Sequence, residues 1–326
     1  LLVLLCLILL GCAGVFGYVH SKFRLMKDDN ASLLDEHENQ DYETVVGADE
    51  DQILQMEQAT SSLDEKEAVL ANSSTYSSKK TAASTLFFKD TDAEKHWVDS
   101  IYNKISLEEK VGQLFMVRSY SNKDSTHVNE IDKLVREYKI GGVFFMQGGP
   151  VRQVRLNNRF QAAAKIPLFI ATDAEWGLAM RLDSTYRYPW NMTLGAIKDL
   201  KLLEKIGENM AKECIRMGIQ FNSAPVIDVN TNPQNPVIGN RSFGEDKIEV
   251  TRSATALMTG FQNQGVFSTA KHFPGHGDTA TDSHLTLPTV TASKKRLKSV
   301  ELYPYKSMIK NGLASIMVAH LNIPSI

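Results

Sequence analysis

The stretch from Lys271 to Pro288 reads KHFPGHGDTATDSHLTLP and directly follows the apolar, β-prone run Val266–Ala270. Pro274, Gly275 and Gly277 rule out a regular helix or a central strand after that run, because proline lacks a backbone donor and glycine weakens both structures. We therefore expect a strand that runs out into a loop. Loops at strand ends carry much of the chemistry of α/β folds, because the strand fixes the loop while its side chains converge on a ligand.

The titratable side chains of this loop allow three interpretations. They are His272, His276, Asp278, Asp282 and His284. A solvated polar turn would not require so many of them. A metal site usually places two histidines one turn apart on a rigid helix, and the glycines remove that support. In an acid/base loop, Asp282 would orient and charge the imidazole of His284, which exchanges a proton near neutral pH.

The spacing KH-x-PG-x-G-x-x-x-x-DSH-x-x-x-P resembles the signature loop of glycoside hydrolase family 3, in its β-N-acetylglucosaminidase (β-hexosaminidase) branch. Further segments that resemble the family extend over about Asp99 to Ile326. In that branch the DSH loop supplies an Asp-His pair as general acid/base, where other branches use a glutamate. The resemblance therefore implies that Asp282 and His284 are catalytic.

The segment Ile170–Arg181 reads IATDAEWGLAMR and places Asp173 just past an apolar strand. Asp173 resembles the family aspartate that accepts hydrogen bonds from hydroxyls of the non-reducing sugar. Arg181 is a second sugar-binding candidate, or else the partner of a neighbouring acid in a salt bridge. Trp176 stands where the branch usually has a second glycine, and its ring could stack on a sugar face or close the mouth of the barrel.

A long Asn/Pro-rich loop follows the next predicted strand and contains Asp228 at its start and Arg241 further along. Long loops in compact domains are usually functional. The resemblance implies that both residues bind sugar hydroxyls, and a guanidinium can fork to two acceptors. Asp228 could also be a simple helix cap. Lys271 and His272 end the following strand and match a pair that contacts sugar hydroxyls in the family.

The order of apolar runs predicts an α/β fold with a parallel sheet. Six β-prone runs are Gln113–Val117, Gly142–Met146, Leu168–Ala171, Gln220–Ile227, Val266–Ala270 and Ser315–Ala319. The stretches between them, such as Leu200–Met217 and Glu249–Gln264, are long enough for helices. No glycine-rich dinucleotide motif follows a strand, and polar residues follow several strands, which favours a (β/α)8 barrel of TIM type over a doubly wound sheet. The resemblance implies the same barrel.

The nucleophile of the family is an aspartate after the seventh barrel strand. Ile326 comes just past the sixth predicted strand, so no residue of this sequence takes that role. We therefore expect the nucleophile, and the strands that complete the barrel, in sequence beyond Ile326.

Residues 1–19 contain no charged side chain and are long enough to span a bilayer. They resemble a signal anchor, or a bacterial lipoprotein signal with acylation at Cys12. Either interpretation places the protein outside the cytoplasm and anchored to the membrane, in the bacterial cell envelope, periplasm or cell surface. Residues 20–94 are strongly acidic and predict a flexible linker, because they have too little apolar surface to offset ordering. Residues 95–326 form the predicted barrel domain.

These features predict a glycoside hydrolase that removes terminal non-reducing β-linked N-acetylglucosamine from glycans or cell-wall fragments such as muropeptides, by a retaining mechanism. One alternative is a phosphorylase, because a histidine acid/base adds no permanent negative charge that would repel phosphate. Another is a non-catalytic sugar-binding barrel. We expect no metal, no cofactor and no nucleic-acid partner. The expected partners are a carbohydrate and, through the N-terminal segment, the membrane.

Overall fold

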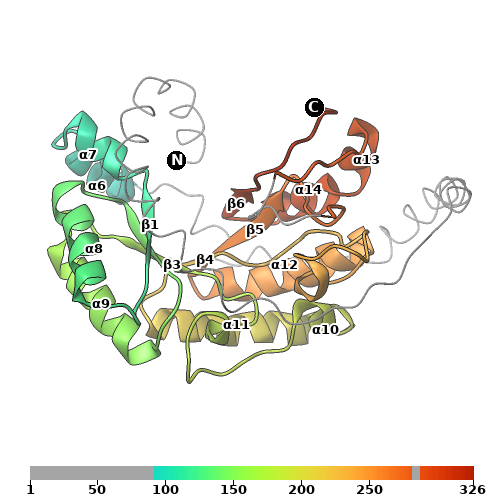
Figure 1. Cartoon of the computed structure of the whole chain (residues 1–326), viewed down its shortest axis with the longest axis horizontal. Coiled ribbons are helices and arrows are strands. Elements are labelled where there is room, and N and C mark those ends of the chain that lie inside the picture. Colours follow the sequence, from blue (N-terminus) through green and yellow to red (C-terminus); the bar gives the residue numbers. More distant parts are fainter. Residues whose placement is uncertain (1–91, 281–286) are drawn as a thin grey trace, which may run out of the picture. The chain divides into compact units, whose positions relative to one another are not determined.

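A curved sheet of parallel strands forms the centre of the fold (Figure 1). The computed structural model describes residues 92–280 and 287–326. The strands within these ranges are β1 (Met116–Ser119), β2 (Gly142–Phe145), β3 (Phe169–Thr172), β4 (Phe221–Asn222), β5 (Phe267–Phe273) and β6 (Ser315–Val318). They lie in chain order and every neighbouring pair is parallel. The carboxyl ends of the strands therefore meet at one edge of the sheet.

Helices connect consecutive strands and follow the outside of the curved sheet (Figure 1). The α-helices are α6 (Asp92–Tyr102), α7 (Leu107–Gly112), α8 (Ser125–Glu137), α9 (Pro150–Ala163), α10 (Asn191–Gly195), α11 (Leu200–Arg216), α12 (Lys247–Asn263), α13 (Lys294–Ser299) and α14 (Leu302–Lys310), with short 3-10 turns η2 (Leu178–Met180) and η3 (Gly239–Arg241). Asp124, Asp199 and Asp246 cap α8, α11 and α12 by accepting from backbone N–H groups of the first turn. These caps fix where each helix begins.

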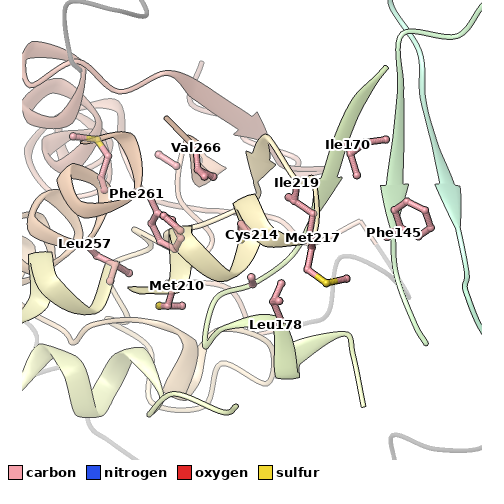
Figure 2. Packing of buried hydrophobic residues seen from close by; sticks show 14 of the residues in the cluster. Phe145, Ile170, Leu178, Met210, Cys214, Met217, Ile219, Leu257, Phe261 and Val266 are labelled. Carbon is pink, nitrogen blue, oxygen red and sulfur yellow. The ribbon is translucent and has the colours of Figure 1, made fainter. Parts of the chain in front are cut away.

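The core lies between the sheet and the helices that cover it (Figure 2). Phe145 and Ile170 are fully buried side chains of the strands, and Leu257 and Phe261 are fully buried on α12. Cys214 belongs to the same cluster on α11. Burial, with a smaller effect of a neighbouring glutamate, raises the pKa of its thiol to about 12, so Cys214 is an uncharged core residue.

The predicted α/β fold with a parallel sheet is confirmed, because each of the six predicted runs overlaps one strand. Three strands differ clearly in extent. β5 continues to Phe273, three residues past the predicted end at Ala270. β1 begins at Met116 because α7 continues to Gly112 and Gln113 caps its carboxyl end. β4 has only two residues, although single hydrogen bonds to its neighbours continue beyond it: Ser223 donates to the Thr172 carbonyl at 2.9 Å, and Ile227 donates to the Lys271 carbonyl at 2.8 Å.

Within residues 92–280 and 287–326, no helix is long and apolar enough to cross a membrane. The predicted export segment at residues 1–19 and all but the last three residues of the predicted linker at residues 20–94 lie outside the described residues. The catalytic candidates Asp282 and His284 also lie outside them. The assignments for these segments therefore stay predictions.

Candidate active site

A cluster of charged side chains lies at the carboxyl ends of β3, β4 and β5. Its members, called the polar cluster below, are Asp173, Glu175, Arg181, Asp228, Arg241, Lys271 and His272. Asp173 and Glu175 follow β3, Asp228 follows β4, and Lys271 and His272 are near the end of β5. Arg181 directly follows η2, and Arg241 is the last residue of η3. All six sugar-binding candidates named from the sequence are in this cluster.

Lys271 is the central cation of the polar cluster. Its Nζ lies 2.8 Å from Oδ1 of Asp173 and 2.6 Å from Oε1 of Glu175. Arg181 binds the other oxygen of Asp173 at 2.5 Å. Arg241 forks onto Glu175, with Nε 2.9 Å from Oε2 and Nη2 2.8 Å from Oε1. Each of these two acids therefore meets two cations, the arrangement that a buried carboxylate needs to stay charged.

Asp228 binds the backbone at the end of β5 and in the loop that follows it. Its carboxylate accepts from the backbone N–H of His276 at 2.7 Å and of His272 at 3.2 Å. It also lies 2.7 Å from Nδ1 of His272, whose Nε2 is 3.4 Å from Nη2 of Arg241. Because Arg241 can only donate, this network assigns the proton to Nδ1 and leaves Nε2 as an acceptor.

The ion pairs set the charge of the three acids. Burial alone would raise the pKa of the Glu175 carboxyl, but Lys271 and Arg241 outweigh burial and hold that pKa well below its usual range. Burial likewise opposes ionisation of Asp173, and Lys271 and Arg181 lower its pKa. Burial would also raise the pKa of Asp228, but the His272 ring and the backbone donors outweigh burial and lower that pKa. All three side chains are therefore carboxylates at neutral pH.

The polar cluster has an exposed layer and a buried layer. The side chains of Asp173, Arg181, Arg241 and His272 are each 11% to 20% exposed. Those of Lys271, Glu175 and Asp228 are at most 3% exposed. The first group can touch a ligand directly, whereas the second group holds the first group in place.

The loop after β5 is fixed by polar contacts as far as it is described. The side-chain amide of Asn235 donates to the His276 carbonyl at 2.7 Å, and the Thr279 hydroxyl lies 2.6 Å from Nδ1 of His276. Burial lowers the pKa of His276, so its ring is neutral near pH 7. At Gly277, a Cβ atom would lie 1.9 Å from the Val229 carbonyl oxygen, so only glycine fits there. His276, Gly277 and Thr279 are therefore held in defined positions.

Sequence reasoning did not select Glu175 as a site residue. Its side chain is fully buried between Lys271 and Arg241, and it connects the β3 loop to the loop that carries Arg241. The signal was its spacing of two residues from Asp173 just past a strand, because side chains at i and i+2 of extended chain share one side. In the described residues, no three His, Cys, Asp or Glu side chains converge as they would around a metal ion.

Comparison with known proteins gives consistent matches. The model for the glycosyl hydrolase family 3 N-terminal domain matches residues 106–326. Beta-hexosaminidase A of Pseudoalteromonas piscicida is 36% identical over 211 residues, covering 60% of this chain and 35% of the relative. A family 3 β-N-acetylglucosaminidase structure from Paenibacillus is 37% identical, with a TM-score of 0.63 over 68% of this chain and 43% of that chain. The structure of the beta-glucoside phosphorylase BglX is 27% identical, with a TM-score of 0.68 over 73% and 42%.

The chain thus spans less than half the length of each of these three proteins. The family match nevertheless covers most of the chain and includes every residue of the polar cluster. The parallel sheet, the strand-end location of the cluster and the DSH motif agree with it. The chain belongs to glycosyl hydrolase family 3 and is similar to its β-hexosaminidases.

Proposed function

We propose that the protein hydrolyses terminal non-reducing β-linked N-acetylglucosamine from glycans or cell-wall fragments. The observation that carries this proposal is the alternating set of cations and carboxylates that Lys271 joins at the strand ends. Fixed donors and acceptors of this kind suit the hydroxyl groups of a sugar, each of which both donates and accepts. We also propose that the six strands belong to an eight-stranded barrel, since they are parallel and in chain order.

The partly exposed side chains would contact the terminal sugar. The Asp173 carboxylate would accept from its hydroxyls, and Arg181 and Arg241 would donate to them. His272 would take part through Nε2. The buried Lys271 would keep the Asp173 carboxylate charged and oriented, so that its hydrogen bonds to the sugar are charge-assisted.

Asp282 and His284 are proposed as the acid/base pair of a retaining mechanism. His284 would protonate the glycosidic oxygen as the bond to the sugar breaks, while a carboxylate nucleophile forms a covalent glycosyl-enzyme. His284 would then deprotonate the water that releases the sugar. Asp282 would hold the imidazole in the required orientation and stabilise its charged form. We assign the nucleophile to no residue between 92 and 326.

Leaving groups of different basicity test this assignment in the full-length protein. A leaving group that departs easily needs no proton, so formation of the glycosyl-enzyme from an activated aryl N-acetylglucosaminide should change little in His284→Ala. Cleavage of a sugar leaving group should fall roughly 10² to 10⁴-fold, the usual range for general acid catalysis. Asp282→Asn should show the same pattern more weakly. Pre-steady-state rates across a series of aryl leaving groups provide the measurement.

Three outcomes of that experiment would contradict the proposal. If His284→Ala lowered the rate by the same factor for every leaving group, His284 would not be the acid. If a chelator lowered the rates of the wild type by that same uniform factor, the result would favour a metal site. Sugar binding by the wild type without turnover of any substrate would favour a non-catalytic binding barrel.

Phosphorolysis is the second candidate, because the solved structure of a beta-glucoside phosphorylase matches 73% of this chain with a TM-score of 0.68. A neutral His284 adds no negative charge near the anomeric carbon, so phosphate could approach the glycosyl-enzyme in place of water. Mass spectrometry of products formed in phosphate buffer separates the two reactions. N-Acetylglucosamine 1-phosphate as main product would replace hydrolysis by phosphorolysis.

We also propose that the protein works outside the cytoplasm, tethered to the membrane by residues 1–19 and separated from it by the acidic residues 20–94. The support is the apolar composition of the first segment and the charge of the second. Fractionation of cells that express the full-length protein tests the anchor. Recovery in the soluble cytoplasmic fraction would contradict it.

A further inference from the structure

A chain of polar contacts joins the helices after the DSH motif to the loop before it, and the function proposed above does not use these contacts. Nη2 of Arg296, on α13, donates to the Thr231 hydroxyl at 3.2 Å. That hydroxyl donates to Oδ1 of Asp278 at 3.3 Å. Nε of Arg296 lies 3.3 Å from Oε1 of Glu301, the N-cap residue of α14. These four residues are called the Arg296 network below.

The hydroxyl of Thr231 makes the Arg296 network continuous. A hydroxyl has one proton to donate and lone pairs that accept, whereas a guanidinium can only donate. Thr231 therefore accepts from Arg296 and gives its own proton to a carboxyl oxygen of Asp278. Arg296 thus reaches the loop after β5 through a single intervening side chain.

Glu301 supports the backbone of the same loop. A Cβ atom at Gly275 would lie 2.7 Å from both Cβ and Cγ of Glu301, so the loop and the start of α14 are in direct contact. The Glu301 side chain is 1% exposed. Burial raises the pKa of its carboxyl, and the guanidinium of Arg296 opposes that effect by stabilising the charged form. The buried acid therefore gives Arg296 a fixed partner on α14.

The DSH motif lies between two anchored parts of the chain. Asp278, which precedes the motif, belongs to the Arg296 network. After the motif, the N–H of Asn322 donates to the Pro288 carbonyl at 2.9 Å, and the Asn322 carbonyl accepts from Val290 at 2.9 Å. Arg296 follows this second part in the chain and connects it to the first. A segment whose two ends are joined has fewer conformations open to it.

We propose that Arg296 is a positioning residue for the acid/base pair and acts through Thr231 and Glu301. This inference rests on the proposed function, in which the pair is Asp282 and His284. A general acid must lie within hydrogen-bond reach of the oxygen that it protonates, and a misplacement of about 1 Å can lower the rate about 10²-fold. By holding the chain on both sides of the motif, Arg296 sets the place of His284 without touching the substrate.

Substrates that differ in their need for a proton test this role in the full-length protein. The measured quantity is kcat/KM for methyl β-N-acetylglucosaminide, whose leaving group needs a proton, divided by kcat/KM for an activated dinitrophenyl β-N-acetylglucosaminide. A misplaced acid lowers this ratio, whereas loss of folded protein lowers both values equally. We expect Arg296→Met to lower the ratio about ten-fold, which is less than the effect of His284→Ala.

Arg252→Met is the matched control for Arg296→Met. The Arg252 side chain is 39% exposed, against 38% for Arg296, and it also pairs with a glutamate, Glu249, but on α12. We expect this substitution to leave the ratio unchanged.

Variants of Thr231 keep the test decisive if Arg296→Met does not fold. Thr231→Val removes the hydroxyl and should lower the ratio about ten-fold, whereas Thr231→Ser keeps the hydroxyl and should retain most of the ratio. In the double variant Arg296→Met with Thr231→Val, the ratio should fall no further than in Arg296→Met alone, because both substitutions break the same path.

Three results would overturn the positioning role. The first is an unchanged ratio in folded Arg296→Met and Thr231→Val. The second is an equal loss on both substrates, which would mean that Arg296 only stabilises the fold. The third is a double variant whose ratio falls by the product of the two single effects. If instead His284→Ala left the ratio unchanged, the proposed acid itself would be wrong, so the two failures are distinguishable.

Discussion

At the scale of single residues, Glu175 is the group on which the polar cluster depends most. It lies between two buried or partly buried cations and shares Lys271 with Asp173. Removing its charge leaves Lys271 and Arg241 with fewer counter-charges in a region that excludes water. The cost of such a change comes from the cations that remain, and it exceeds the net value of the ion pair itself.

We therefore predict that Glu175→Gln, which keeps the shape and removes the charge, lowers the free energy of unfolding by about 3 to 5 kcal/mol. Urea unfolding followed by circular dichroism measures the change. Glu249→Gln is the control, because Glu249 pairs with Lys198 and Arg252 at the surface, and we expect a loss of about 1 kcal/mol or less. Equal losses in the free energy of unfolding for the two substitutions would show that the buried Glu175 ion pairs matter no more to stability than surface ion pairs do.

The residue scale also shows what the sequence could predict of the site. Asp173, Arg181 and Lys271 were found through the family motif, and they lie together as strand-end residues should. Glu175 was not predicted, because a fully buried acid is unusual unless its cations are known. Those cations are Lys271 on β5 and Arg241 in the loop after β4, both far away in the sequence, so the pairing cannot be predicted locally.

At the scale of elements, helices α11 and α12 approach closely through two glycines. A Cβ atom on Gly260 would lie 2.1 Å from the Glu204 carbonyl oxygen and 2.9 Å from Cα of Gly207. Both clashes involve backbone atoms, which cannot turn away as a side chain can. The contact therefore fixes the spacing of the two helices, and through them the positions of β4 and β5.

We predict that Gly260→Ala lowers the free energy of unfolding by about 3 kcal/mol, the upper part of the range for overpacking, although alanine is the better helix former. Thermal and urea unfolding measure the loss. Lys205→Ala, at an exposed position of α11, is the control and should change stability by less than about 0.5 kcal/mol. A stabilised Gly260→Ala would mean that the helices can separate at little cost.

Local patterns explain which elements the sequence predicted and where their limits were wrong. The apolar runs overlap all six strands, because short, near-continuous apolar and β-prone runs are typical of parallel strands. The start of β1 was misplaced because the capping box of Ser106 and Glu109 begins a helix, α7, which runs to Gly112 and occupies the residues just before the predicted strand. That S-x-x-E signal was in the sequence. The length of β4, in contrast, depends on its hydrogen bonds with β3 and β5, which are far away in the sequence.

At the scale of the whole molecule, the sheet brings together charges that are far apart in the chain. Asp173 and Lys271 are 98 residues apart, and their contact requires β3, β4 and β5 to be adjacent and in register. The cluster therefore forms only when the sheet forms. Its ionisation must then be linked to folding, because these pairs are absent from the unfolded chain.

We predict that stability falls in acid. The pKa values of Asp173, Glu175 and Asp228 are lower in the fold than their ordinary 3.8 or 4.5, so their contribution is complete above about pH 5 and is lost as the pH falls through those values. Burial raises the pKa values of Glu213 and Glu301, whose contribution runs in the opposite direction and offsets part of the loss. The free energy of unfolding should therefore decrease by roughly 2 to 3 kcal/mol between pH 5 and pH 3. Urea titrations at both pH values test this, and Glu175→Gln should show a smaller decrease because one linked carboxylate is gone. If the free energy of unfolding decreased equally in the wild type and in Glu175→Gln, Glu175 would not be ionised and paired in the folded state.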